Sequence, residues 1–185
     1  MSWDDDKFER FVQATVRMAR GEMPGYGYPH VVYPYASEDE MACIEAVRQM
    51  PGRLSPAGLG SRLLPVAPLV ARSTARFSRR ELRDASEYRR LETDLADPRN
   101  GITAKAAKLG ADTIRSEAAE DTIILLCRLG ALYPFGHVSG LLDSIVAAGI
   151  RNTLAVAYPG TAEGTQLRFL GMLSPTGGYR GHVVT

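Results

Sequence analysis

The sequence predicts an α/β fold in which a mostly parallel central sheet is flanked by helices and a β-hairpin lies near the C-terminus. The first observation is that the segments DTIILLCRL (121–129) and NTLAVAY (152–158) contain continuous apolar runs, which are typical of strands buried on both faces. The second is that a helical segment, Val138 to Ala148, lies between them. Strand, helix and strand within about 38 residues form a βαβ unit, which implies parallel strands and a right-handed crossover.

Length and charge place the chain among ordinary globular proteins. At 185 residues it is long enough to bury a core, and we expect residues 1–185 to form a single domain. The net charge of +1 is too small to indicate nucleic acid or an anionic membrane as a partner. No apolar run reaches the roughly 18 residues that span a bilayer, and the start MSWDDDKFER lacks a signal-peptide core, so we expect a cytoplasmic protein.

The N-terminal segment predicts a helix followed by a strand. Residues 4–20 place apolar side chains at helical spacing, and the acidic run Asp4 to Asp6 suits the positive end of the helix dipole. The Gly- and Pro-containing segment GEMPGYGYP then interrupts the helix. The run HVVYPY (His30 to Tyr35) is rich in β-branched and aromatic residues, which favours a short strand.

A second helix and a second strand are expected next. Ser37 and Glu40 have the spacing of a capping box, which predicts a helix that runs towards Pro51. The Gly- and Pro-rich stretch after it predicts a loop around one short strand near 62–66. Pro68 is a possible first residue of a following helix.

The middle of the chain predicts two helices. Ser78 and Glu81 form a second capping-box pattern, and the charged residues 79–95 are typical of a solvent-facing helix. Pro98 can begin another helix that reaches about Ala119, with Gly110 as a weak point inside it. We expect the buried stripe of that helix to consist of Ile102, Ala106, Leu109 and Ile114.

The tail predicts the C-terminal hairpin. TQLRFLGML would form the first arm, SPTGG the turn, and YRGHVVT the second arm. A short helix remains an alternative for the first arm.

A possible phosphate-binding loop follows the buried strand 152–158. Gly160 and Gly164 lie where nucleotide-binding folds place their phosphate loops. However, a P-loop requires four residues between its glycines and a following lysine, whereas this loop has three residues there and no lysine. Glu163 would also place a negative charge beside the phosphates. We therefore expect Pro159 and Gly160 to form a turn that ends the strand, with a partner-facing loop after it; a degenerate nucleotide-binding domain remains the alternative.

Other catalytic or metal-binding patterns are incomplete. The segment GHVSG places Ser139 at the wrong position for a G-x-S-x-G nucleophile, although Asp143 and His182 follow in the hydrolase order. None of the three histidines has metal-ligand spacing, and the two cysteines, Cys43 and Cys127, lie among apolar residues, as buried free thiols do. We expect no metal, no cofactor and no enzymatic activity.

One segment is locally basic. Between Arg72 and Arg90 seven arginines outnumber three acidic residues, which would suit contact with a nucleic-acid backbone. The alternative is a solvated helix face with intrahelical pairs. The candidate residues for contact with nucleic acid or a partner are Arg79, Arg80 and Arg83.

Four segments of the chain match motifs of one known protein family. GALYPFGHVSGLLDSI (130–145) is similar to a Gly-x-x-[FY]-Pro segment and the helix after it, and AVAYPGTAEGTQLRFLG (155–171) to a strand, Tyr-Pro-Gly and short acidic loop. GGYRGHVV (177–184) resembles a final strand of that family, and VVYPYASEDE (31–40) its early strand and acidic helix start. On these motifs the chain, above all its C-terminal third, resembles the BrxB family of bacterial BREX (bacteriophage exclusion) systems, which are related to the phage-growth-limitation systems.

The resemblance is not complete, because this chain has His137-Val138-Ser139 where the family typically has Arg-Ser-His. It implies a non-catalytic subunit of an anti-phage defence system that is needed for DNA methylation and phage restriction. Such a subunit would act as an adaptor or scaffold for a PglZ-type phosphatase-like protein or for the methyltransferase. The candidate residues for partner contact are Tyr158, Pro159, Gly160, Glu163, Gly164 and Arg180.

Overall fold

The α/β fold is confirmed in a computed structural model, which describes residues 3–23, 28–75, 77–80, 82–83, 98–163, 166–171 and 181–185. Six strands form the sheet in the order β2-β3-β4-β1-β6, with β5 paired to β4. Every pairing is parallel except that of β4 with β5. The strands are β1 His30–Tyr35, β2 Ser61–Pro65, β3 Ile123–Cys127, β4 Leu154–Glu163, β5 Gln166–Phe169 and β6 His182–Val183.

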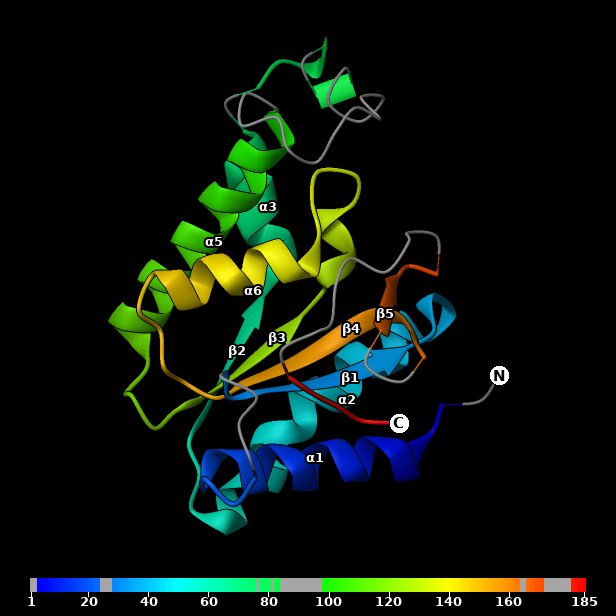
Figure 1. Cartoon of the computed structure of the whole chain (residues 1–185), viewed down its shortest axis with the longest axis vertical. Helices are drawn as coiled ribbons and strands as arrows, with labels where there is room; N and C mark the ends of the chain where they lie inside the picture. The colour runs from blue at the N-terminus through cyan, green and yellow to red at the C-terminus, as the bar shows by residue number, and fades with distance from the viewer. Residues whose placement is uncertain are drawn as a thin grey trace.

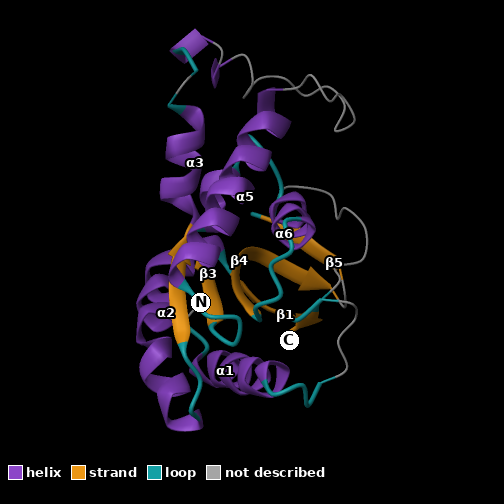
Figure 2. Cartoon of the chain, turned by 90° about the vertical axis from the view of Figure 1, so that its left-hand side faces the viewer, coloured by secondary structure: helices purple, strands orange, loops and turns teal. Residues whose placement is uncertain are grey.

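Helices cover both faces of the sheet (Figure 1; Figure 2). One face carries α1 and α2, and the other carries α3, α5 and α6. The helices are α1 Asp5–Ala19, α2 Glu40–Leu54, α3 Val66–Thr74, α5 Pro98–Glu117 and α6 Val138–Ala147, with short 3-10 turns η1 Ser37–Asp39, η2 Ser55–Ala57 and η3 Leu129–Leu132.

Strands β1 to β4 each contribute side chains to two separate cores. Ile124 and Leu126 of β3 pack with α3, α5 and α6, whereas Ile123 and Leu125 pack with α1 and α2. All five residues of β3 are buried. Successive side chains of a strand point to opposite faces, so a strand covered on both sides must be apolar throughout. This explains the continuous apolar run that predicted β3.

The first helix forms as predicted. The side chain of Asp4 accepts a hydrogen bond from the Lys7 backbone N–H at 2.8 Å, which caps α1. Phe8 is buried and its ring meets Tyr33 of β1 edge-on, with ring centroids 5.4 Å apart. The apolar side of α1 therefore packs in the core between this helix, β1 and α2.

The predicted start and end of the second helix differ from the structure. No side chain caps α2, and Glu40 instead accepts a hydrogen bond from the Tyr35 hydroxyl. The helix also continues through Pro51 to Leu54. Pro51 cannot donate a backbone hydrogen bond, which disfavours a helix through this position. The burial of Met50 and Leu54 offsets that cost and favours the extra turn.

The elements after α2 agree with the prediction more closely. β2 lies one residue earlier than expected, and α3 begins at Val66, which puts Pro68 in its first turn. α5 begins at Pro98 as predicted. Gly110 is a close contact point, because a Cβ there would lie 3.4 Å from Leu69 Cδ1 of α3. Ile102, Ala106 and Ile114 are buried as expected, while Leu109 is partly buried; most of the predicted helix 79–95 lies outside the described residues.

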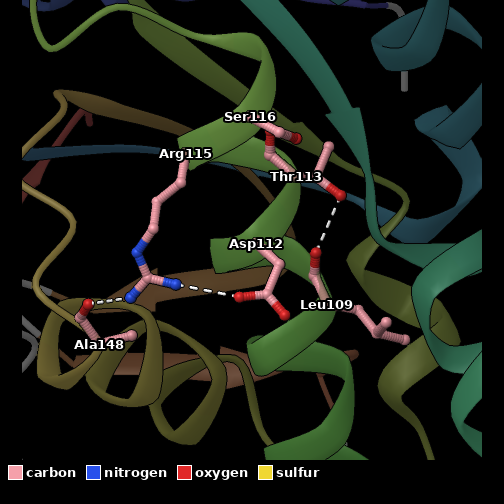
Figure 3. Close-up of polar contacts among 6 residues, drawn as sticks. All are labelled: Leu109, Asp112, Thr113, Arg115, Ser116 and Ala148. Carbon is pink, nitrogen blue, oxygen red and sulfur yellow. Dashed lines mark hydrogen bonds and ion pairs between the residues drawn. The ribbon is translucent and has the colours of Figure 1, made fainter.

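Arg115 connects α5 to the end of α6 (Figure 3). Its Nη2 donates a hydrogen bond to the Ala148 carbonyl oxygen, just after the last turn of α6. Its Nη1 lies 3.0 Å from Asp112 Oδ1 on the same helix as Arg115. A cation at a helix C-terminus satisfies a carbonyl that has no partner within the helix and interacts favourably with the dipole. The contact fixes the two helices relative to each other on this face.

The hairpin near the C-terminus is built from different strands than predicted. β5 pairs with the end of β4, with Glu163 opposite Gln166. Within the described residues β6 does not pair with β5; it lies parallel to β1, with Val31 opposite His182. The reason is that β4 extends further than the sequence indicated, so that it supplies the first arm of the hairpin itself. The edge of β1 then remains open for β6.

Two other expectations concern the cysteines and membranes. Cys43 and Cys127 are buried free thiols, as predicted. Burial raises the pKa of Cys127 to about 11 and raises the pKa of Cys43 as well, so both thiols stay protonated at neutral pH. No helix in the described ranges is both long and apolar enough to cross a bilayer.

Candidate functional site

β4 does not end at the Pro159-Gly160 pair. It is ten residues long, and both of these residues lie within it, so the predicted turn at this position is wrong. The first part of β4 pairs with β1 and β3, and the part from Gly160 onward pairs with β5. The strand therefore leaves the parallel sheet at its carboxyl edge and continues into the hairpin.

β5 occupies the side of β4 that β3 occupies earlier in the strand. Thr153 accepts a backbone hydrogen bond from Ile124 of β3, and Pro159 accepts one from Leu170 after β5. Alternate residues of a strand direct their backbone groups to the same side, and 153 and 159 are an even number of residues apart. Proline is tolerated here because its missing N–H falls where β4 changes from one neighbour to the other.

Gly160 is required by the close approach of β5. Its φ is +152°, a value that side-chain-bearing residues rarely adopt. A Cβ at this position would lie 2.1 Å from the Arg168 carbonyl oxygen. The glycine thus serves strand pairing.

This hairpin covers the place where many α/β enzymes bind their ligands. The chain leaves β1 for α2 on one face and leaves β3 for α6 on the other, so the carboxyl edge between them is a topological switch point. β4 lies between those two strands. Its extension and β5 direct Tyr158, Leu167 and Phe169 into the core beside η3. The edge is consequently filled by apolar side chains.

The predicted partner-contact residues do not form one exposed surface. Tyr158 is only 4% exposed and its ring lies 5.8 Å from that of Phe169; burial raises the pKa of its hydroxyl to about 12. Pro159 and Gly160 are also buried. Glu163 is exposed, and its Oε2 lies 3.4 Å from Arg168 Nη2. Gly164 and Arg180 lie outside the described residues.

Sequence reasoning missed Arg168. The run QLRF alternates polar and apolar residues, and this period of two places Gln166 and Arg168 on one face while Leu167 and Phe169 are buried. In the strand predicted for this segment, that alternation indicates that Arg168 lies on the opposite face from Leu167 and Phe169. The alternation shows which face is buried only when the pairing of β5 with β4 is known.

The segment after η3 presents an exposed aromatic side chain. Tyr133 is 47% exposed, whereas most large apolar side chains of the described residues are buried. Its loop is held on α5, because Thr103 Oγ1 donates a hydrogen bond to the Phe135 carbonyl at 3.3 Å. A Cβ on Gly136 would lie 1.9 Å from the same Oγ1, so this contact also requires glycine. Tyr133 therefore projects from a loop whose backbone is fixed.

The comparison with protein families agrees with the sequence motifs. Residues 79–184, more than half of the chain, match the family model described as BREX protein BrxB. The chain belongs to the BrxB family. It is therefore a component of a BREX anti-phage defence system. No curated protein and no solved structure matches the chain.

The BrxB match includes α5, α6 and the strands from β3 to β6. The motif at 31–40 lies outside it, in β1 and the start of α2. Yet β1 separates β4 from β6 in the sheet. The BrxB region and the segment before it are parts of one sheet.

The three histidines of this BrxB-family chain lie in β1, before α6 and in β6. His30 is buried in β1, and burial lowers its pKa to about 4, so the imidazole is neutral at physiological pH. His137 precedes α6 and His182 lies in β6. In the part of the chain that the structure describes, no three His, Cys, Asp or Glu side chains are placed to hold a metal ion.

The pattern around Ser139 has none of the structure of a nucleophile elbow. η3 and a further loop separate β3 from α6, so Ser139 does not lie at a sharp strand-to-helix turn. Ser139 is partly buried and Asp143 is exposed, both on α6.

The basic segment begins in the last turn of α3. Arg72 on α3 and the three candidate residues after it, Arg79, Arg80 and Arg83, are all exposed. Asp84 and Glu87 could pair with Arg80 and Arg83 within a helix, but both acidic residues lie outside the described ranges.

Proposed function

We propose that this chain is a non-catalytic adaptor of its BREX system, which binds larger components and holds them in one assembly. The observation that supports this most directly is the apolar filling of the carboxyl edge by Tyr158, Leu167 and Phe169. An enzyme of this architecture would use that edge for substrate. An adaptor requires a stable body and exposed loops or strand edges.

The partner that we expect is the PglZ-type phosphatase-like protein or the methyltransferase of the same system. The nucleotide-binding alternative has less support, because Gly160 is packed against the backbone of β5. A thermal-shift screen with ATP, GTP and magnesium tests that alternative separately.

Co-purification tests the adaptor proposal. The chain would be expressed with the other components of its BREX system, one tagged at a time, and we expect it to elute in stoichiometric amount with at least one of them. A tagged component purified in the absence of this chain serves as the control for correct folding of the partner. Elution of the chain by itself in every combination would contradict the proposal.

A second function, contact with DNA, is favoured by the exposure of Arg79, Arg80 and Arg83. We expect a gel shift of duplex DNA that weakens as salt rises, because phosphate contacts release counterions. Changing all three residues to Glu should abolish the shift. Arg48→Glu is the matched control, because the side chain of Arg48 is exposed on α2, which covers the other face of the sheet from α3. A shift that survives the triple change, or is lost equally with Arg48→Glu, would rule out this surface.

A further inference from the structure

The η3 segment, which we define as residues 128–137, presents an exposed arginine and an exposed tyrosine. It leaves β3 at the carboxyl edge of the sheet and runs through η3 to the start of α6. Arg128 precedes η3 and is exposed, and Tyr133 follows η3 and is 47% exposed. Tyrosine and arginine are enriched among the residues that carry most of the binding energy of protein interfaces.

The backbone between these two side chains is fixed. Leu129 and Leu132 of η3 are fully buried. The Tyr133 N–H donates a hydrogen bond to the Gly130 carbonyl oxygen at 3.1 Å. The Gly136 N–H donates one to the Leu132 carbonyl oxygen at 2.9 Å. A side chain on a fixed backbone loses less conformational freedom when it binds, so more of its contact energy contributes to affinity.

Tyr133 is exposed although the chain buries most of its large apolar side chains. Among the described residues, the exposed ones of this kind are Met41 on α2, at 75%, and Tyr133, at 47%. A partner that encloses the ring would remove apolar surface from water and could hydrogen-bond the hydroxyl at its tip. A projecting aromatic side chain therefore fits an apolar pocket.

Arg128 has a backbone conformation that glycine would adopt at lower cost. Its φ is +58° and its ψ is +38°, in the left-handed region that disfavours residues with a Cβ. Strained residues of this kind cluster at binding sites, where the surrounding structure holds them. The cost of arginine at this turn favours a role for its side chain, which places a cation on the surface beside η3.

We propose that the η3 segment is the surface by which this chain docks on another BREX component: Tyr133 enters an apolar pocket of the partner, and Arg128 pairs with a carboxylate at the rim of that pocket. A 3-10 turn rises about 2 Å per residue, so the two Cα atoms are roughly 10 Å apart and fit within one interface. A two-fold dimer through this segment would instead bring together the Arg128 side chains of both copies, which their like charge disfavours. The proposal rests on the adaptor function above and adds to it the binding surface and the chemistry of the partner.

Calorimetry with the co-purified partner tests the role of Tyr133. Tyr133→Ala should weaken binding at least about tenfold, because it removes an anchoring aromatic side chain. Met41→Ala is the matched control, since it also truncates an exposed apolar side chain, and it should bind like the wild type. Wild-type affinity in Tyr133→Ala, or an equal loss in Met41→Ala, would overturn the proposal.

A second pair of variants tests Arg128. Arg128→Glu should also weaken binding at least about tenfold, whereas Arg151→Glu should not, because Arg151 is exposed before β4 at the opposite edge of the sheet. Arg128→Gly separates binding from folding, because glycine relieves the backbone while the side chain is lost. Its unfolding temperature should stay the same or rise, and its binding should weaken. Unchanged affinity in both Arg128 variants would contradict the role of this side chain in docking.

The outcomes separate the docking surface from the adaptor function. If a complex forms and neither Tyr133→Ala nor Arg128→Glu weakens it, the η3 segment is not the docking surface and the adaptor function stands. If no complex forms, the adaptor function fails and this proposal fails with it. A dimer of the chain alone that Tyr133→Ala abolishes, as measured by light scattering, would also overturn the proposal, because the occupant would then be a second copy.

Discussion

Tyr158→Ala should lower the free energy of unfolding by about 3–5 kcal/mol, the usual cost of truncating a buried aromatic side chain. Tyr158 is 4% exposed and packs on Phe169 in the core that also contains Leu129 and Leu132. Alanine would leave a cavity between the end of β4, β5 and η3. Chemical denaturation followed by circular dichroism measures the loss directly.

Tyr158→Phe is the control, because it keeps the ring and removes only the hydroxyl. We expect it to cost no more than about 1.5 kcal/mol, the range of a single hydrogen bond. The pair of variants separates packing from any polar role of the hydroxyl. A Tyr158→Ala protein that unfolds like the wild type and yet loses its partner would show that the side chain faces the partner and not the core.

Gly160→Ala should also destabilise the protein strongly, by roughly 2–4 kcal/mol, through both backbone strain and collision. Its φ of +152° disfavours any side chain, and the Cβ would lie 2.1 Å from the Arg168 carbonyl oxygen. A backbone atom in a paired strand cannot move aside as a flexible side chain can. We expect β5 to separate from β4, which raises exchange of the Arg168 amide more than exchange in β3.

Gly149→Ala is the matched control for Gly160→Ala. Gly149 also has a positive φ, +84°, but a Cβ there would meet no atom within 4 Å. Only the conformational cost remains, about 1–2 kcal/mol. Equal losses for the two variants, measured by the same denaturation, would mean that contact with β5 is not what requires glycine at position 160.

The parts of the fold that the sequence predicted are those in which hydrophobic pattern and burial agree. β3 is buried on both faces and has no polar residue between Ile123 and Cys127. α1 has its acidic cap and its apolar stripe on the expected positions. In these elements the polarity of each residue matches its burial, so the local hydrophobic pattern is sufficient to predict the element.

The parts that were not predicted depend on pairing between distant segments. Pro159-Gly160 has the composition of a turn, and only the change of neighbour from β3 to β5 explains how a strand continues through it. Likewise, a strand was predicted at His182 and Val183, but its partner was not, because β6 pairs with β1 at the other end of the chain. Tyr158, Pro159 and Gly160, which were expected as partner contacts, are buried for the same reason, because β5 pairs with the end of β4.

The position of β1 between β4 and β6 limits whether the BrxB region can be produced as a separate fragment. A fragment cut to residues 79–184 would contain both β4 and β6 but not the strand that joins them in the sheet. The apolar edge of β4 would be bare, and β6 would have nothing to pair with. Both portions of the chain contribute strands to the same sheet. We therefore do not expect the residues matched by the family model to fold as an independent unit.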